Sequence, residues 1–410
     1  MATDVPTDPI DVDRARADTP GCDLVVHLNH AGASLVPRPV LDAQIEWLQA
    51  EALTGGYELA VDREAERRAT YDEVAALVGA EHDEIALVEN ATFAWHQAFW
   101  SLPLRPGDRI LTCTVEYASS YLSYLQAERR RGVSIEVIPD DEHGQLSVDA
   151  LARLLDDGRS PVGLVAVTHV PTNGGLVNPV AEVGALCREA GVPFLLDACQ
   201  SVGQMPVDVN EIGCDLLSAT GRKFLRAPRG TGFLYVRRSL LERLDRMGAE
   251  PAFLDLLGAD WVAPGHYELR QDARRFENWE SNLAAVAGLR AAVAYAMAWG
   301  LGAIAERVGT VAESLRARLA EVAGVRVHDL GRRRSGIVTF SVDGVGAEDV
   351  RDRLRAQRIN VSVSEPSSTR LDAERRRLPP LVRASVHYVT TDAELDRFTG
   401  AVAGMVAASS

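Results

Sequence analysis

VPFLLDACQ, at residues 192–200, is the stretch that decides the fold, because an apolar run of strand length ends there in an acid and an amide. Short apolar runs of the same kind recur along the chain as DRILTCTV (108–115), SIEVIP (134–139), VGLVAVTHV (162–170), CDLLSAT (214–220) and TGFLYV (231–236). From about residue 70 they alternate with amphipathic stretches of helical period. This alternation predicts an α/β fold with a largely parallel sheet.

The remaining chain predicts a second, smaller domain. We expect residues 1–22 to be a loose leader, residues 23–290 a large domain, and residues 291–410 a small α+β domain. Residues 23–60 would contribute to the small domain or to a loop at the active site. An Ala-rich helical stretch, residues 282–323, is interrupted near Gly300 and Gly302 and would act as a spacer between the domains.

Composition excludes several classes of protein. The 410 residues are 47% apolar, which is enough for a large core, yet no apolar run reaches the roughly 18 residues of a membrane span. The net charge of -15 disfavours nucleic acid as a partner. Five scattered cysteines without a CxxC motif indicate neither a disulfide framework nor a zinc site, and no metal is expected. The cytoplasm is the expected compartment.

Lys223 is the only lysine among 43 cationic side chains, so the other 42 are arginines. Arginine can replace lysine wherever a solvated cation is sufficient. It fails where a primary amine must lose its proton and attack a carbonyl, because guanidinium stays protonated. A single retained lysine in this background is therefore a candidate nucleophile.

Asp197 ends the strand predicted at residues 192–197, and Lys223 follows the strand that ends near Ala219. Functional loops of open α/β sheets lie at the carboxyl ends of strands, so these side chains should meet at one edge. Pyridoxal 5'-phosphate (PLP) requires an amine for its aldehyde and a carboxylate for its pyridinium nitrogen. Lys223 and Asp197 meet this requirement, whereas the GxGxxG and GxxxxGK[ST] motifs of NAD-binding and P-loop proteins are absent from the sequence.

From about residue 25 to residue 400 the chain resembles the class V aminotransferases, which are PLP-dependent enzymes of fold type I and include cysteine desulfurases and isopenicillin N epimerase-like proteins. The most specific segments are LLDACQSVG (195–203), SATGRKF (218–224), RFENWESN (275–282) and LVRASVHYVTT (381–391). The resemblance implies a mainly parallel seven-stranded sheet in the large domain. It also implies a homodimer whose active sites are completed across the subunit interface.

The same resemblance assigns cofactor contacts. Lys223 would be the Schiff-base lysine, Asp197 the partner of the pyridinium nitrogen, and Gln200 a donor to the ring 3'-oxygen. A second contact to that oxygen falls at Thr172 or Asn173, between which the sequence does not decide. Tyr117 would stack on the ring. The candidates for the phosphate site are Ala91 and Thr92, which open a helix whose amides favour an anion, and Thr220 and Arg222.

Substrate contacts are implied in the same way. Arg383 would grip the α-carboxylate with its planar fork, and Asn29, Ala31 and Gly32 belong to an amino-terminal loop that closes over that carboxylate. Two departures from the family pattern are visible. Desulfurases carry histidine at position 222, and threonine at position 280, where this chain has Glu280, which would repel a partner subunit's phosphate.

The sequence restricts the reaction without fixing it. Cysteine desulfurases use a loop cysteine before the carboxylate-binding arginine, and SVSEPSSTRLD (362–372) has none. We expect an enzyme acting on an α-amino acid, either transaminase-like or a carbon–sulfur lyase on a cysteine conjugate in secondary metabolism. An epimerase or a decarboxylative or oxidative deaminase on the same fold is the alternative. A PLP-binding protein with a regulatory, non-catalytic role is the alternative from another class.

Overall fold

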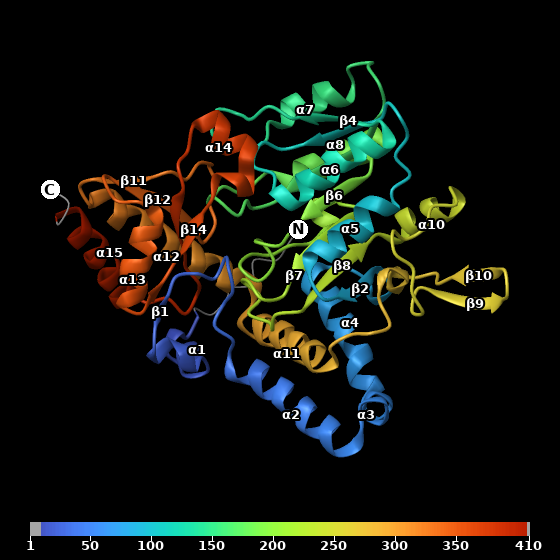
Figure 1. Ribbon diagram of the computed structural model, residues 1–410, viewed down its shortest axis with the longest axis horizontal. Coiled ribbons are helices and arrows are strands. Elements are labelled where there is room, and N and C mark those ends of the chain that lie inside the picture. The colour runs from blue at the N-terminus through green and yellow to red at the C-terminus, as the bar shows by residue number, and fades with distance from the viewer. Residues whose placement is uncertain (1–9, 408–410) are drawn as a thin grey trace.

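The computed structural model describes residues 10–407, and its centre is a seven-stranded sheet in the order β2-β8-β7-β6-β5-β3-β4 (Figure 1). Neighbouring strands from β7 to β4 are parallel, and β8 is antiparallel to both β7 and β2. The strands are β2 (Ile85–Val88), β3 (Arg109–Thr112), β4 (Ser134–Val137), β5 (Val162–Thr168), β6 (Phe194–Asp197), β7 (Leu216–Thr220) and β8 (Gly232–Val236). The predicted α/β fold with a mainly parallel, seven-stranded sheet is confirmed.

Helices cover both faces of this sheet, which is why every residue of β3, β6, β7 and β8 is buried. Alternate strand residues enter two core clusters: Leu196 and Leu217 face one, and Leu195 and Leu216 face the other. The first cluster is closed by α4 (Glu64–Val78), α7 (Val148–Leu155), α8 (Val180–Ala190), α9 (Val209–Ile212) and α11 (Leu283–Trp299). The second is closed by α5 (Ala91–Ser101), α6 (Ala118–Arg131) and α10 (Arg238–Arg246).

A smaller antiparallel sheet with the order β11-β12-β15-β14 forms a separate unit, on the left in Figure 1. Its strands are β11 (Val325–Val327), β12 (Ile337–Val342), β14 (Ser362–Ser364) and β15 (Leu381–Ser385). Helices α12 (Leu301–Glu321), α13 (Ala347–Ala356) and α15 (Asp392–Ala407) pack against it around a core of their own. Two further elements, the short 3-10 helix Pro366–Thr369 and α14 (Arg370–Arg376), precede β15.

The Ala-rich spacer is helical and breaks where the sequence predicts the first interruption. Gly300, with φ of 80°, separates α11 from α12, and the two helices are bent by 79°. Gly302 does not interrupt the helix, because it lies inside α12. Within residues 10–407, no single helix has the length and hydropathy of a membrane span; only the bent pair α11 and α12 reaches them together.

Part of the predicted loose leader is ordered, so that prediction is wrong for residues 12–17. These residues form α1 (Val12–Ala17), in which Ala15 is fully buried. Arg16 donates to the carbonyl of Val389 and pairs with Glu394, both at 2.9 Å. The partners of α1 lie some 370 residues away in the sequence, so no local sequence pattern predicts these contacts. Residues 1–9 of the predicted leader lie outside the described residues.

The segment after α1 links the two units. β1 (Val26–His27) pairs in parallel with β13 (Ile359–Asn360) of the smaller unit, and α2 (Arg38–Thr54) packs on α11 of the larger one. Helix α3 (Gly56–Asp62) continues from α2. These placements agree with a contribution of residues 23–60 to the small domain. The boundary at residues 290 and 291 falls inside α11, and the division into domains stays a proposal.

One hairpin, β9 (Ala259–Ala263) with β10 (His266–Leu269), projects away from the rest of the molecule, on the right in Figure 1. Trp261 on this hairpin is 77% exposed, and nearby segments expose Phe253, Leu256 and Trp279. Exposed aromatic side chains in such number are typical of a surface that another protein covers.

Candidate active site

A cleft of about 90 Å³, partly open to solvent, lies at the carboxyl ends of β5, β6 and β7. Most of the residues that the sequence predicts for a cofactor line it. They are Ala91, Thr92, Tyr117, Thr172, Asp197, Gln200, Thr220, Arg222 and Lys223. The parallel register of β5, β6 and β7 sets Thr168 beside Asp197 and Asp197 beside Ser218, so the strand ends meet at one edge of the cleft.

Lys223 is half-buried on the loop between β7 and β8. Loss of water around the ammonium lowers its pKa, and the charges of Arg222 and Arg383 lower it further, while Asp197 acts in the opposite direction. A lowered pKa increases the fraction of neutral amine, which is the nucleophilic form. Geometry and electrostatics therefore agree with the role expected for this lysine.

Asp197 is the last residue of β6 and is 8% exposed. Its Oδ1 accepts a hydrogen bond from the backbone N–H of Cys199 at 2.8 Å, and its own carbonyl accepts from the N–H of His169 at 3.0 Å. These bonds fix the carboxylate at the strand end. Its second oxygen is left available to a ligand in the cleft, which the expected contact with a pyridinium nitrogen requires.

Thr172 and Asn173, the two alternatives for the ring-oxygen contact, have different surroundings. Thr172 lines the cleft, where its hydroxyl accepts from Gln200 Nε2 at 3.4 Å and from Arg383 Nη1 at 2.8 Å. Asn173 Nδ2 instead donates to the carbonyl of Glu365 at 2.8 Å. The structure thus favours Thr172 for the contact and gives Asn173 a role in holding the smaller unit.

The candidate phosphate site combines a helix end with a strand end. Asn90 caps α5, its side chain accepting from the N–H of Phe93 at 2.9 Å, which leaves the amides of Ala91 and Thr92 directed at the cleft. A Cβ on Gly232 would lie 3.3 Å from the nitrogen of Ala91 and 2.6 Å from the carbonyl oxygen of Ala219. Only glycine lets β8 start this close to the helix end.

Polar and charged groups without partners test whether a PLP-like ligand fits. Within the described residues, Gln200 Oε1 and Arg383 Nε are buried without a hydrogen-bond partner. Arg222, Lys223 and Arg383 form no ion pair with any carboxylate of residues 10–407. Burial lowers the pKa of Arg383 to about 10, so it remains charged near neutral pH. The cleft therefore offers uncompensated positive charge, which suits a phosphate and a carboxylate.

The amino-terminal loop, defined as residues Asn29–Leu35, borders the cleft without lining it. The N–H of Ala31 donates to Ser385 Oγ at 2.8 Å, and its carbonyl accepts from Gln200 Nε2 at 3.2 Å. The carbonyl of Gly32 accepts from Arg222 Nη1. A Cβ on Gly32 would meet Asn29 Oδ1 at 2.5 Å, so a larger residue here would displace the Asn29 side chain. Asn29 and Ala31 thus contact Ser385, and Gly32 contacts Arg222, whereas the role of these residues toward a substrate carboxylate stays a prediction.

Glu116 is a site residue that sequence reasoning missed. It is fully surrounded by protein, and burial raises the pKa of its carboxyl to about 7. Its Oε1 accepts from Thr168 Oγ1 at 2.5 Å and from the N–H of Tyr117 at 2.8 Å, and its Oε2 accepts from Thr112 Oγ1 at 2.8 Å. Glu116 therefore fixes the backbone that carries Tyr117. The only sequence signal was its position immediately before the expected stacking residue.

Arg226, also missed, anchors the turn that follows Lys223. Its φ of 63° is unusual for a residue with a side chain, and it is 2% exposed. The guanidinium donates to Thr19 Oγ1 at 2.6 Å, to Tyr388 Oη at 2.7 Å and to the carbonyl of Leu35 at 3.1 Å. These partners lie near both ends of the described chain, which explains why no local pattern reveals them.

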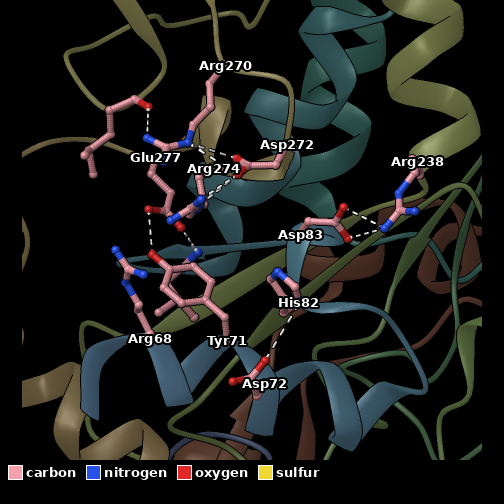
Figure 2. Close-up of polar contacts among 12 residues, drawn as sticks. Arg68, Tyr71, Asp72, His82, Asp83, Arg238, Arg270, Asp272, Arg274 and Glu277 are labelled. Carbon is pink, nitrogen blue, oxygen red and sulfur yellow. Dashed lines mark hydrogen bonds and ion pairs between the residues drawn. The ribbon is translucent and has the colours of Figure 1, made fainter. Parts of the chain in front are cut away.

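Figure 2 shows polar contacts near the segment that resembles a cross-subunit contact, among them the contact between Glu277 and Tyr71. Glu277 Oε2 accepts from Tyr71 Oη at 2.9 Å, and Oε1 accepts from the N–H of Leu87 at 2.7 Å. Glu280, by contrast, is exposed. The start of this segment is thus held inside the subunit, and a contact of Glu280 with a partner's phosphate stays untested.

The buried carboxyl of Glu277 gives a prediction for stability against pH. Burial raises its pKa to about 7 from an ordinary value of 4.5, so the folded state holds the proton more tightly than the unfolded state. The free energy of unfolding should therefore fall by up to about 3 kcal/mol as pH rises from about 4.5 to 7. In Glu277→Gln the amide oxygen can still accept from the N–H of Leu87, while the amide N–H can donate to Tyr71 Oη, whose hydroxyl then acts as the acceptor. The amide does not titrate, so this contribution should vanish.

Urea unfolding of both proteins at several pH values between 5 and 8 measures the effect. Other groups, including Glu116, titrate in the same range in both proteins, so only the difference between the two curves reports on Glu277. Parallel curves over this range would contradict the assignment.

Cysteine chemistry in this cleft is limited to Cys199, since no other cysteine of the described residues lines it. Burial raises the pKa of the Cys199 thiol well above its ordinary value, which disfavours the nucleophilic thiolate. The segment before β15, where desulfurases carry their reactive cysteine, forms α14 and a short 3-10 helix without one.

Comparisons with known proteins identify the family of the chain. The family model "Aminotransferase class-V" matches residues 26–398. A probable cysteine desulfurase of Methanothermobacter thermautotrophicus is 28% identical over 377 residues, covering 90% of this chain and 92% of that protein. A probable hercynylcysteine sulfoxide lyase of Mycobacterium tuberculosis is 31% identical over 389 residues, covering 94% and 91%. The apo structure of a cysteine desulfurase from Thermococcus onnurineus aligns with a TM-score of 0.88 at 25% identity, covering 97% and 98%.

Proposed function

This chain belongs to the class V aminotransferase family and is a PLP-dependent enzyme, and on that premise we propose that it is a carbon–sulfur lyase acting on an S-substituted cysteine. The observation that carries the proposal is a cleft lined by residues predicted to bind the cofactor, together with a segment, 362–380, that lacks the cysteine a desulfurase needs. The similarity to a probable hercynylcysteine sulfoxide lyase supports it. Residues 362–380, which precede Arg383, contain no cysteine that could supply the thiolate of a desulfurase.

Each step of such a reaction has a residue in position. Bound PLP supplies an electron sink for the pair left when the α-proton is removed. Arg383 binds the substrate α-carboxylate, and its bonds to the carbonyl and hydroxyl of Thr172 hold the guanidinium in place. Lys223, with its lowered pKa, takes the α-proton. Asp197 balances the positive charge of the pyridinium nitrogen.

The reaction balances without an external oxidant or reductant. The α-proton passes to the Lys223 amine and the Cβ–S bond breaks. The sulfur leaves with the bonding electrons and takes up that proton from the Lys223 ammonium, giving a thiol or, from a sulfoxide, a sulfenic acid. The released three-carbon enamine takes up water and gives pyruvate and ammonia. A desulfurase would instead give alanine and transfer the sulfur to a thiolate of its own cysteine. The described cleft has no exposed thiolate that could accept the sulfur.

Product analysis tests this proposal. The enzyme loaded with PLP is supplied with S-alkyl-L-cysteines, their sulfoxides and free L-cysteine. We expect pyruvate and ammonia in equal amounts from an S-substituted substrate, and no alanine from L-cysteine. Alanine with protein-bound persulfide, or a sulfur-containing keto acid without ammonia, would point to desulfuration or transamination and refute the lyase assignment.

A homodimer is also part of this proposal. The exposed aromatic side chains of the β9–β10 hairpin and of Trp279 support it, since such surfaces are usually covered by protein. Sedimentation equilibrium of the PLP-loaded protein gives the mass that checks it.

A further inference from the structure

Arg222 contacts the amino-terminal loop with both its side chain and its backbone. The guanidinium Nη1 donates to the carbonyl of Gly32, and the carbonyl of Arg222 accepts from the N–H of Ser34 at 2.9 Å. The residue next in sequence is Lys223. A single residue thus joins the loop expected over the substrate carboxylate to the loop that carries the candidate nucleophile.

The side chain of Arg222 has capacity for a second partner. A guanidinium has five N–H donors in a planar fork, and the bond to Gly32 uses one of them. Arg222 lines the cleft and pairs with no carboxylate of residues 10–407. It can therefore hold the loop and face an anion in the cleft at the same time. Histidine offers at most two N–H donors, so arginine provides more donors for the two partners.

The far side of the loop is attached to the strand that carries Arg383. Asn29 forms a bridge with Ser385, and the N–H of Ala31 donates to Ser385 Oγ at 2.8 Å. Ser385 and Arg383 both belong to β15. The amino-terminal loop therefore connects β15, which carries Arg383, with the loop that carries Lys223. Arg222 is the residue that attaches it to the Lys223 loop.

We propose that Arg222 is a positioning residue that couples the cofactor end of the cleft to the amino-terminal loop, so that this loop is held in place for the substrate carboxylate. The inference rests on the proposed function for the identity of the substrate, but the contact with Gly32 is independent of it. Where desulfurases have histidine, the arginine of this chain would thus both contact an anion in the cleft and hold the amino-terminal loop in position.

Substitutions of Arg222 separate these two roles. Arg222→Lys keeps the positive charge and removes the forked donors, while Arg222→Gln removes the charge. Arg238→Lys, an arginine-to-lysine change at an exposed position away from the cleft, is the matched control. For each PLP-loaded protein we would measure amide hydrogen exchange of residues 29–35, the affinity for PLP, and kcat and KM.

For Arg222→Lys we expect exchange of residues 29–35 and KM each to rise by about tenfold, the effect of losing a charge-assisted hydrogen bond, and PLP affinity to fall less than in Arg222→Gln because the positive charge is kept. Arg222→Gln should raise exchange similarly and also weaken PLP binding, while Arg238→Lys should change none of these. Unchanged loop exchange in both Arg222 variants would overturn the proposal. Hydrogen exchange needs no turnover, so a failure of the lyase assignment would leave this result readable.

Discussion

Lys223→Ala is expected to lower turnover by at least about 10²- to 10⁴-fold, because the change removes the group that takes the α-proton. The variant should also lose the visible absorbance of the covalent cofactor–lysine link while still binding PLP through the phosphate site. Turnover and the absorption spectrum of the PLP-loaded protein measure both effects. Activity close to that of the starting protein would remove Lys223 from the mechanism.

The single lysine makes the site of attachment directly testable. Borohydride reduction of the PLP-loaded protein, followed by peptide mass spectrometry, should find the pyridoxyl group at residue 223. The control is Arg238→Lys, which adds a second, exposed lysine outside the cleft. Labelling of residue 238 as strongly as residue 223 would mean that the reaction reports on any accessible amine rather than on the cleft.

Asp197→Asn is the second change with a large expected effect. Asparagine has nearly the same shape, and its Oδ1 can still accept the hydrogen bond from the N–H of Cys199. It lacks the negative charge that would keep the pyridinium nitrogen protonated. We expect kcat to fall by about 10²- to 10³-fold, the scale of losing one fixed electrostatic contact to the reacting group.

The Asp197 prediction is separable from a simple loss of cofactor. PLP affinity measured by absorbance titration should change much less than kcat, and Asp197→Glu, which keeps the charge on a longer side chain, should recover part of the rate. An unchanged kcat in Asp197→Asn would show that the carboxylate does not tune the cofactor.

The sheet and the centre of the site could be predicted because their sequence signals are local. Runs such as VPFLLD contain a whole buried strand together with the side chain at its end, and parallel register then brings Asp197 near Lys223. The isolation of Lys223 is a property of composition and needs no structure. Family resemblance added Gln200 and Arg383, which the structure places around Thr172.

What could not be predicted depends on contacts between distant segments. Glu116 differs from a surface acid only because Thr112, Thr168 and Tyr124 close around it. Helix α1 is a short polar segment until Arg16 meets Val389 and Glu394. Thr172 and Asn173 are adjacent residues, and only the packing of the smaller unit shows which of them enters the cleft.

Arg226 has a consequence for the order in which a newly made chain can become active. Its partners Thr19 and Tyr388 are 369 residues apart, and both are needed to satisfy a guanidinium next to the Lys223 loop. A ribosome must therefore release nearly the whole polypeptide before this loop can acquire its final shape. The sheet can assemble earlier, during translation. The cleft would become able to bind the cofactor in its productive orientation only after the last segments have folded.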